Sequence, residues 1–366
     1  MLRRADSWGV CQRTTTVVLV MVLLIALTIS LPTIHVLARA TAFTSDAVFR
    51  LPVRPLTWVT GDPTTQPIEW HAGGRGLLTL PSGNEPHPGL VLVLGADAAA
   101  PNDDRIERLT ESLARIGFAV LLAQSDELDS SLVLPLETPR LVNAFERLRS
   151  HPLIRPDSIG YIGLSAGGSL AIVAAAQPEI AADVAFVVAI GPYYDASTLA
   201  AAVVSHSFRH PGGIEFWEPA KISSRVVRQT LFSALPKAER TAIEAGQPAS
   251  SKAGHAVVAL FNRPTFEDAE ILLTSLNPQQ QELFEAISPR HQMADLRAPL
   301  YLLHDRNDEF IPWVESETLA VAHAPAIYHR LDLFNHVDPD PSNLRFVARD
   351  GWRLLRLFIR IIGDSR

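Results

Sequence analysis

Cysteine is almost absent from this chain of 366 residues, which contains one, Cys11, near the N-terminus. The rest of the chain can therefore form no internal disulfide and no thiolate metal site. An excess of basic residues is also lacking, because 32 lysines and arginines are outnumbered by 39 aspartates and glutamates. Nucleic-acid binding needs clustered positive charge to displace counterions from phosphates, so we expect no nucleic-acid partner.

The 12 histidines are scattered along the chain and show no ligand spacing such as H-E-x-x-H. We therefore expect no metal ion and no cofactor. Hydrophobic residues make up 47% of the chain and charged residues 19%, which is ordinary for a globular protein. A chain of this length can bury a core large enough to fold without disulfides or metals.

One long hydrophobic run is present, from about residue 14 to residue 37, and its centre over 17–27 carries no charge. Roughly 20 such residues in a helix, at about 1.5 Å each, match a hydrocarbon core of about 30 Å. Arginines 3, 4 and 13 precede the run, which favours a cytoplasmic N-terminus and translocation of the rest of the chain.

We therefore interpret residues 1–40 as a membrane anchor or signal peptide, and the remainder as extracytoplasmic. In the preferred interpretation the N-terminal helix stays in the membrane. The alternative is secretion after cleavage near Ala40, because Ala38, Arg39 and Ala40 resemble a small-x-small cleavage site. Residues 41–66 are expected to form a linker.

Strand-like and helical patterns alternate from residue 67 onward, beginning with a hairpin around Gly73 and Gly74. The predicted strands are 67–72, 76–80, 89–94, 118–122, 158–164, 183–190, 298–303 and 327–333. The predicted helices lie near residues 102–116, 138–149, 166–176, 314–323 and 343–362. This alternation implies parallel strand–helix–strand units, hence a mostly parallel sheet with helices on both faces.

The alternation is interrupted over residues 192–296, which are too many for a loop within a compact domain. Helices are predicted near 226–235 and 253–261, and further helices begin at Thr265 and at Asn277-Pro278, where an N-cap precedes a proline. We predict a helical cap inserted between two parts of one core, 67–191 and 297–366.

The residues Gly163, Ser165 and Gly167 match the pattern G-x-S-x-G. They lie between an apolar strand and a helix rich in small residues, the context in which this pattern exposes a nucleophilic serine on a sharp turn. Both glycines are needed there, because a side chain at either position would clash with the neighbouring strand or helix. The helix after Ser165 also directs its N-terminal amides toward the site, which favours a developing oxyanion.

A serine hydroxyl needs a base, and the base needs an acid to orient it. Asp308 follows a predicted strand and is our choice of acid. Asp305, in the tight part of the same turn, and Asp195, after the preceding strand, are the alternatives. His336 follows the last predicted strand, 28 residues after Asp308, and is the predicted base.

Several segments resemble the α/β-hydrolase superfamily, and in particular its dienelactone-hydrolase-like and prolyl-oligopeptidase-like members. They are Leu80-Pro81, the run Pro88 to Gly95, the run Gly163 to Gly168, His304 to Asp308 with Ile311-Pro312, and His336. The resemblance covers about residues 67–362 apart from the insertion. It implies an α/β-hydrolase fold, a Ser165–Asp308–His336 triad and hydrolysis through an acyl-enzyme.

An oxyanion hole requires a second backbone amide besides that of Ala166. The loop after the first central strand would supply it, and Ala96 follows a glycine that permits a sharp turn, with Asp97 as the neighbouring alternative. Many α/β-hydrolases carry His-Gly where this chain has Leu94, Gly95 and Ala96, so the resemblance does not specify the subclass.

The sequence thus predicts a serine hydrolase, and most directly a carboxylic-ester hydrolase acting on a small-molecule or lipid ester. Peptidase, thioesterase and acyltransferase activities use the same residues and are the alternatives within enzymes. A different class is a non-catalytic, membrane-tethered binding protein of the same fold. Phe216, Trp217, Tyr193 and Tyr194 are predicted as apolar walls of the substrate pocket. The sequence specifies no oligomeric state.

Overall fold

The computed structural model describes most of the chain beyond the N-terminal apolar run. The described residues are 36–50, 54–96, 103–332, 334–336, 338–339 and 344–364. The predicted membrane segment therefore lies largely outside them. No helix in these ranges is both long enough and apolar enough to span a bilayer.

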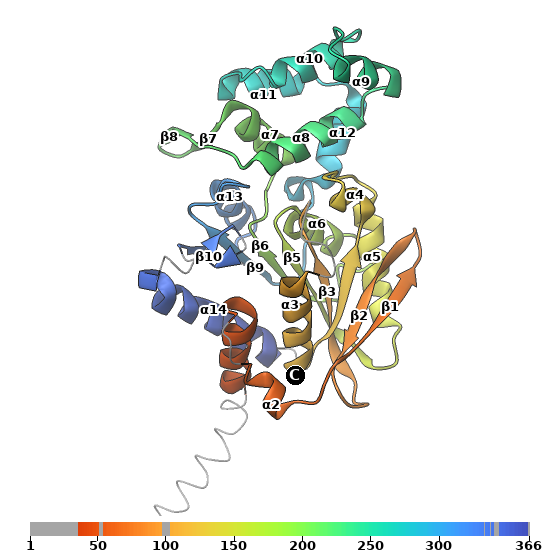
Figure 1. The fold of residues 1–366 in the computed structure, drawn as a ribbon, viewed down its shortest axis with the longest axis vertical. Coiled ribbons are helices and arrows are strands. Elements are labelled where there is room, and N and C mark those ends of the chain that lie inside the picture. Colours follow the sequence, from red (N-terminus) through yellow and green to blue (C-terminus); the bar gives the residue numbers. More distant parts are fainter. Residues whose placement is uncertain are drawn as a thin grey trace, which may run out of the picture.

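The core is an eight-stranded sheet in the order β1-β2-β4-β3-β5-β6-β9-β10 (Figure 1). The first three strands in this order pair antiparallel, and the others pair parallel. The bounds are β1 Thr64–Trp70, β2 Gly74–Leu80, β3 His87–Val93, β4 Ala119–Gln124, β5 Ile154–Leu164, β6 Val184–Ile190, β9 Leu300–Asp305 and β10 Ile327–Leu331. All eight predicted strands are present, and the mostly parallel α/β sheet is confirmed.

Helices cover both faces of this sheet. Leu90 and Leu92 of β3 pack in a cluster with α3 (Asp104–Arg115) and α14 (Leu344–Asp364). Val91 and Val93 of the same strand pack in a second cluster with α5 (Glu137–Arg149) and α6 (Ala166–Ala175). Because successive side chains of β3 point to opposite faces and both faces are buried, its sequence reads as one continuous apolar run.

The described segments 36–50 and 54–59 carry residues that pack against the core, so the linker prediction for 41–66 is wrong over most of its described part. A helix over 36–43 continues into the π-helical turn η1 (Thr44–Val48), and α2 (Leu56–Val59) follows. The Phe43 ring lies 4.4 Å from that of Phe358 in α14, centroid to centroid, and Leu56 is also buried. Buried Asp46 accepts hydrogen bonds from Arg54 and from two residues of α3.

The insertion forms a cap beyond the carboxyl ends of the parallel strands, at the top of Figure 1. It comprises α7 Ala196–Ser205, β7 Ser207–His210, β8 Gly213–Phe216, α8 Lys221–Ser233, α9 Lys237–Glu244, α10 Lys252–Leu260, α11 Phe266–Thr274, α12 Pro278–Ile287 and the short η2 Pro289–His291. The four predicted helices are present, and α12 begins with a complete capping box on Asn277. Helices α7 and α9 and the β7–β8 hairpin add to what the sequence analysis predicted.

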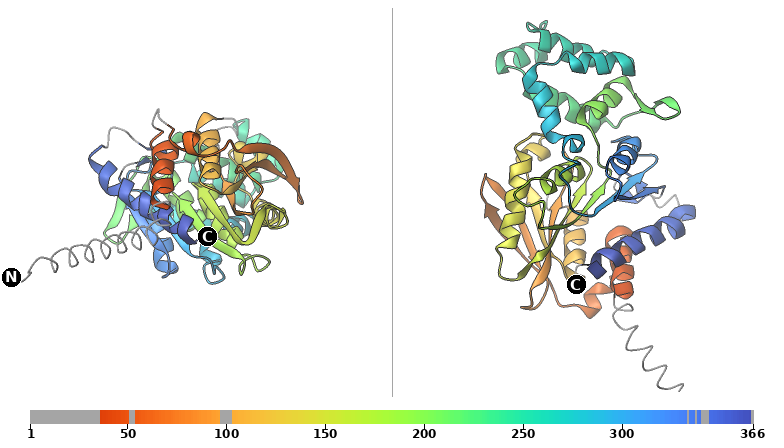
Figure 2. Two further views of the ribbon diagram at one scale, coloured as in Figure 1. Left: turned by 90° about the horizontal axis from the view of Figure 1, so that it is seen from below. Right: turned by 180° about the vertical axis from the view of Figure 1, so that it is seen from behind.

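Four short elements complete the described chain. They are α4 Asp126–Asp129, α13 Val314–Ala322 and the two-residue strands β11 Phe334–Asn335 and β12 Asp338–Pro339. Figure 2 shows from behind that the cap and the first described helix lie at opposite ends of the molecule, with the sheet between them.

Candidate active site

Ser165 occupies the turn between β5 and α6 with φ 55° and ψ −132°, a conformation that a residue with a side chain rarely adopts. Its two glycine neighbours make this turn possible. A Cβ added to Gly163 would lie 2.4 Å from the carbonyl oxygen of Gly167, and one added to Gly167 would lie 2.3 Å from that of Leu94. Neither position can therefore accept a side chain without displacing the backbone.

Asp308 lies three residues beyond β9, and its carboxylate is buried. One carboxylate oxygen, Oδ1, accepts the backbone amides of Phe310 and Ile311, at 2.7 and 3.0 Å. The other, Oδ2, lies 2.6 Å from Nδ1 of His336. Burial would raise the pKa of Asp308, but the charge of His336 and hydrogen bonds from His304 and His336 outweigh it and hold the pKa well below its usual value.

His336 is also buried and sits in the turn between β11 and β12 with a left-handed backbone, φ 58°. Since the partner of Nδ1 is an ionised carboxylate, Nδ1 carries the ring proton and its N–H donates a hydrogen bond to Asp308. The opposite ring nitrogen, Nε2, is then the acceptor of the neutral ring. The Phe310 ring stacks on the imidazole at 4.4 Å with an interplanar angle of 18°.

Ser165, Asp308 and His336 converge on one short segment at the end of β6. The amide of Ser165 donates to the carbonyl of Ile190 at 2.7 Å. A Cβ on the next residue, Gly191, would lie 3.2 Å from the His336 ring and 3.3 Å from the Asp308 carboxylate. Within the described chain no hydrogen bond joins Ser165 Oγ to His336, as is common for catalytic pairs without bound substrate.

The two other candidate acids have different partners. Asp305 accepts the amide of Asn307 and so caps its own turn. Asp195 caps α7 through the amide of Ser197 and pairs with Arg290 at 2.8 Å. Asp308 is the candidate whose carboxylate contacts His336.

Ala166 and Ala96, the predicted oxyanion donors, both line the cavity at Ser165. Ala166 is the first residue of α6, where backbone amides point out of the helix. The loop that carries Ala96 approaches the serine closely, because a Cβ on Gly95 would lie 2.8 Å from the Ser165 Cβ. The alternative donor, Asp97, lies outside the described residues.

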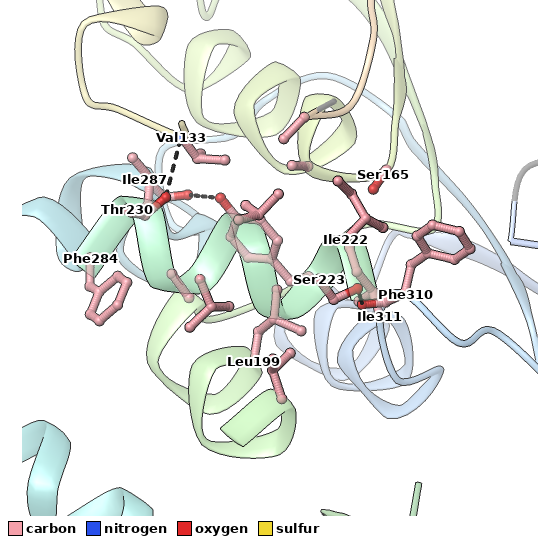
Figure 3. Close-up of a pocket in the computed structure, with 17 residues that line it drawn as sticks. Val133, Ser165, Leu199, Ile222, Ser223, Thr230, Phe284, Ile287, Phe310 and Ile311 are labelled. Carbon is pink, nitrogen blue, oxygen red and sulfur yellow. Dashed lines mark hydrogen bonds between the residues drawn. The ribbon is translucent and has the colours of Figure 1, made fainter. Parts of the chain in front are cut away.

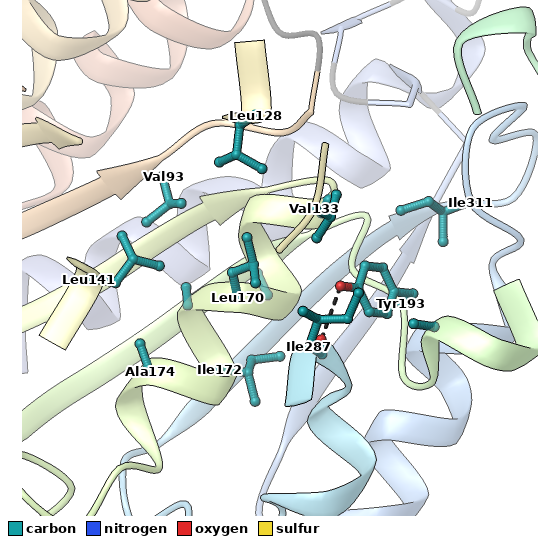
Figure 4. Close-up of a cluster of buried hydrophobic side chains, with 14 of the residues drawn as sticks. Val93, Leu128, Val133, Leu141, Leu170, Ile172, Ala174, Tyr193, Ile287 and Ile311 are labelled. Atoms are coloured by element: carbon teal, nitrogen blue, oxygen red, sulfur yellow. Dashed lines mark hydrogen bonds between the residues drawn. The ribbon is translucent and has the colours of Figure 1, made fainter. Parts of the chain in front are cut away.

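A narrow cavity with a volume of about 70 Å³ extends from Ser165 beneath the cap (Figure 3). Most of its lining is aliphatic or aromatic, and none of the described lining residues is charged. The lining residues are Ala96, Val133, Ser165, Ala166, Tyr193, Ala196, Leu199, Val203, Ile222, Ser223, Val226, Val227, Thr230, Phe284, Ile287, Phe310 and Ile311. The cavity lining continues into the hydrophobic core, because Val133, Tyr193, Ile287 and Ile311 belong to the same buried cluster as Leu170 of α6 (Figure 4).

The predicted aromatic walls are only partly correct. Tyr193 lines the cavity, and its hydroxyl donates to the carbonyl of Ile287. Phe216 is 75% exposed at the end of the β7–β8 hairpin, so its assignment to the pocket is wrong. Trp217 and Tyr194 are half-buried and lie outside the lining, and the Trp217 indole donates to the carbonyl of Asp308 at 2.8 Å.

Three hydrogen bonds that no sequence pattern predicts join the cap to the loop that carries the acid. Besides the Trp217 bond, the amide of Ala220 donates to the carbonyl of Glu309 at 2.6 Å. The hydroxyl of Ser223 donates to the carbonyl of Phe310 at 3.0 Å. The start of α8 is therefore fixed to the segment that positions His336.

His304, in β9, is buried beside the acid. Its Nε2 lies 2.9 Å from the carbonyl of Ile311 and 3.3 Å from Oδ2 of Asp308. Its Nδ1 lies 2.7 Å from the hydroxyl of Ser316 in α13. These contacts brace the acid loop against α13.

Glu315 joins α13 to the first residues of the cap. Its carboxylate accepts the amides of Tyr194 and Asp195 and the hydroxyl of Thr198. Burial raises the pKa of Glu315 to about 6, although these three hydrogen bonds oppose the shift.

In the described ranges no group of three histidine, cysteine, aspartate or glutamate side chains is placed to hold a metal ion.

Comparison with solved structures identifies molecules of similar fold. A Pyrococcus horikoshii acylaminoacyl peptidase aligns with a TM-score of 0.51 and 14% identity over 83% of this chain, which spans 42% of the peptidase. A 2,6-dihydroxy-pseudo-oxynicotine hydrolase aligns with a TM-score of 0.49 and 14% identity over 88% of this chain and 72% of its own. Est1E from Butyrivibrio proteoclasticus gives 0.46 and 14% identity over 83% of this chain and all of its own.

No protein-family model matches the sequence, and no curated protein matches it significantly. The similarity is therefore one of fold, in agreement with the strand order, the parallel pairing and the position of the serine turn described above. On this evidence the chain has the α/β-hydrolase fold.

Proposed function

We propose that this protein is a serine hydrolase that cleaves carboxylic esters through an acyl-enzyme. The observation that carries the proposal is the strained Ser165 at the mouth of an apolar cavity, beside a buried Asp308–His336 pair. A strained serine turn, a histidine and an orienting carboxylate are the parts that nucleophilic acyl transfer requires.

In the first half of the reaction, Ser165 Oγ attacks the ester carbonyl carbon while His336 Nε2 takes the hydroxyl proton. The negative charge that develops on the carbonyl oxygen faces the backbone amides of Ala166 and Ala96. Asp308 stays ionised and stabilises the imidazolium. The bond to the alcohol oxygen then breaks, and His336 returns the proton to the departing alcohol.

In the second half, a water molecule takes the place of the alcohol. His336 accepts one proton from this water, and the water oxygen attacks the acyl carbon bound to Ser165 Oγ. When the bond between the acyl carbon and Oγ breaks, His336 returns the proton to Oγ and the carboxylic acid leaves. The enzyme ends in its starting protonation state, and the balance needs no cofactor.

Labelling with a fluorophosphonate probe tests this proposal directly. We expect Ser165 to be the labelled residue, and the Ser165→Ala variant to lose both labelling and hydrolysis of p-nitrophenyl esters. Ser150→Ala, which changes an exposed serine away from the cavity, is the matched control and should label normally. A folded wild-type protein that never labels would exclude the mechanism.

The same experiment separates the alternatives. Rates on an ester, a thioester and an amide with the same acyl group rank the hydrolase classes, and added alcohols reveal acyl transfer. Full biological function in Ser165→Ala would instead identify a binding protein of this fold.

We also propose that residues 1–40 hold the protein at a membrane, with the rest on the extracytoplasmic side. The apolar run and the arginines before it support this. The proposal is independent of the chemistry at Ser165.

A further inference from the structure

The described lining of the cavity at Ser165 runs from the serine along the underside of the cap (Figure 3). Ala96 and Ala166 line it near the serine, whereas His336 is not among the described lining residues. His336 instead contacts Asp308 and the ring of Phe310. Since the histidine must protonate the leaving alcohol, the alcohol lies on the His336 side, and the group that enters the cavity is the acyl chain.

Apart from the nucleophile Ser165, the hydroxyl groups of the cavity each have a hydrogen-bond partner in the protein. The hydroxyl of Tyr193 donates to Ile287, and that of Ser223 donates to Phe310. Thr230, at the far end, accepts the amide of Val133 at 3.3 Å (Figure 3). With no charged side chain among the described lining residues, a charged or strongly polar acyl group would lose its hydration without gaining a partner.

The volume limits the length of the chain that can enter. One water molecule needs about 10–15 Å³, so a cavity of about 70 Å³ has room for a few groups of that size and not for a long fatty acyl chain. We propose that the preferred substrates are esters of short, uncharged aliphatic acids. This inference rests on the proposed esterase function and adds the acyl class.

Helix α8 forms one long wall of this cavity. Ile222, Val226 and Thr230 recur every four residues on its lining face, and Figure 3 shows Ile222 near Ser165 and Thr230 toward the other end. Val226, one turn beyond Ile222, is half-buried, so its side chain can change size without breaking the core. We therefore assign acyl-length selection to Val226.

The test uses the full chain and p-nitrophenyl esters of acids from acetate to palmitate. We expect kcat/KM to be highest for butanoate or hexanoate, and at least about tenfold lower for decanoate and longer chains. Val226→Ala should raise the octanoate-to-butanoate ratio of kcat/KM by about tenfold, and Val226→Leu should lower the hexanoate-to-acetate ratio by a similar factor. Val258→Ala, on the outer part of the cap, should leave the profile unchanged.

Fluorophosphonate labelling of the same samples separates the two proposals. A protein that labels at Ser165 but prefers long chains, shows a flat profile or hydrolyses none of the esters overturns the short-acyl inference and leaves the nucleophile in place. Profiles that do not change in either Val226 variant overturn the assignment of Val226. Failure of wild-type labelling removes the enzyme proposal on which the inference depends.

Discussion

The hydrogen bond between Asp308 and His336 fixes which nitrogen of the imidazole can act as a base. Because the carboxylate stays ionised and occupies Nδ1, the acceptor lone pair of the neutral ring is on Nε2. The backbone amides of Phe310 and Ile311 hold the other carboxylate oxygen, so the carboxyl group cannot rotate away. The tautomer of His336 is thus set by the loop after β9.

Asp308→Asn tests this control of the tautomer. The asparagine Oδ1 can still accept the two amides, but its NH₂ group donates to Nδ1 and places the ring proton on Nε2, where it blocks proton uptake from Ser165. We expect kcat to fall by about 10⁴-fold with little change in folding, and the rate of fluorophosphonate labelling to fall with it. Asp305→Asn, the matched change in the same turn, should retain most activity. Equal losses in both variants would contradict the role of Asp308.

Among single residues, the sequence predicted those whose position follows from chain order or from the geometry of one turn. Gly163 and Gly167 identify Ser165 because their packing excludes side chains, and Asp308 follows a strand in the expected order. The stacking of Phe310 on His336 could not be predicted, because it joins two loops that are separated by a helix and a strand. Such contacts depend on how the loops fold over one another.

At the scale of elements, the cap and the acid loop form one unit. Trp217, Ala220 and Ser223 hold the carbonyls of three consecutive residues, 308–310. Movement of the first turn of α8 would break these bonds. We therefore expect the site to stay assembled without substrate, and access to the cavity to depend on side-chain motion.

Trp217→Phe measures the strength of this connection. The change removes the indole donor and leaves the carbonyl of Asp308 without that partner, which costs about 1–3 kcal/mol. We expect kcat to fall about tenfold with KM nearly unchanged, because the acid loop relaxes while the acyl cavity keeps its lining. Trp352→Phe, at an exposed position on α14, is the control. A variant with normal kcat would show that the acid loop is positioned without the cap.

Glu315 connects α13 to the cap through a buried carboxylate. Because this carboxylate titrates, we expect the free energy of unfolding to depend on pH. Its pKa is raised from 4.5 to about 6, so its contribution to stability is fully present below pH 4.5 and is lost as the pH rises through about 6. The loss amounts to about 2 kcal/mol. In Glu315→Gln the amide can keep the contacts with Tyr194, Asp195 and Thr198 and cannot ionise.

We expect urea denaturation over this pH range to show a fall in the free energy of unfolding for the wild type. The fall should be about 2 kcal/mol smaller for Glu315→Gln. Glu317→Gln, on the same helix, is the control. Parallel curves for the wild type and Glu315→Gln would show that Glu315 does not titrate in this range.

The elements that the sequence did not predict share a physical cause. The strands of the β7–β8 hairpin are four residues long and carry polar residues, so they lack a periodic apolar signal. The linker prediction was wrong because Phe43 and Leu56 are buried by α3, α14 and the sheet, which are distant in sequence. Strong local signals, such as the capping box at Asn277, were predictable because they act within one turn.

At the scale of the whole molecule, the cap and the first described helix, over 36–43, lie at opposite ends (Figure 2). If the apolar run before residue 36 is in a membrane, the cap lies at the end of the described chain opposite to the first helix after that run. This arrangement favours an ester that reaches the site from the aqueous phase over one drawn directly from the bilayer, in agreement with the short acyl cavity.

Cell fractionation checks the membrane proposal. We expect the full chain to remain in the membrane fraction after alkaline carbonate washing, and protease added on the extracytoplasmic side to degrade the domain. Fusing residues 1–40 to a soluble reporter should confer the same behaviour. Release of the intact chain by carbonate would contradict an anchor, and a mature N-terminus near Thr41 would show cleavage.

The bonds between α8 and the acid loop also bear on how new specificities could arise in this protein. A cap grafted from another protein of this fold would bring its own pocket but would lose the donors on Trp217, Ala220 and Ser223, and with them the support of Asp308. Exchange of the cap as a module would therefore impair the chemistry together with the substrate preference. Single substitutions on the cavity face of α8 can change the substrate preference and leave the chemistry intact.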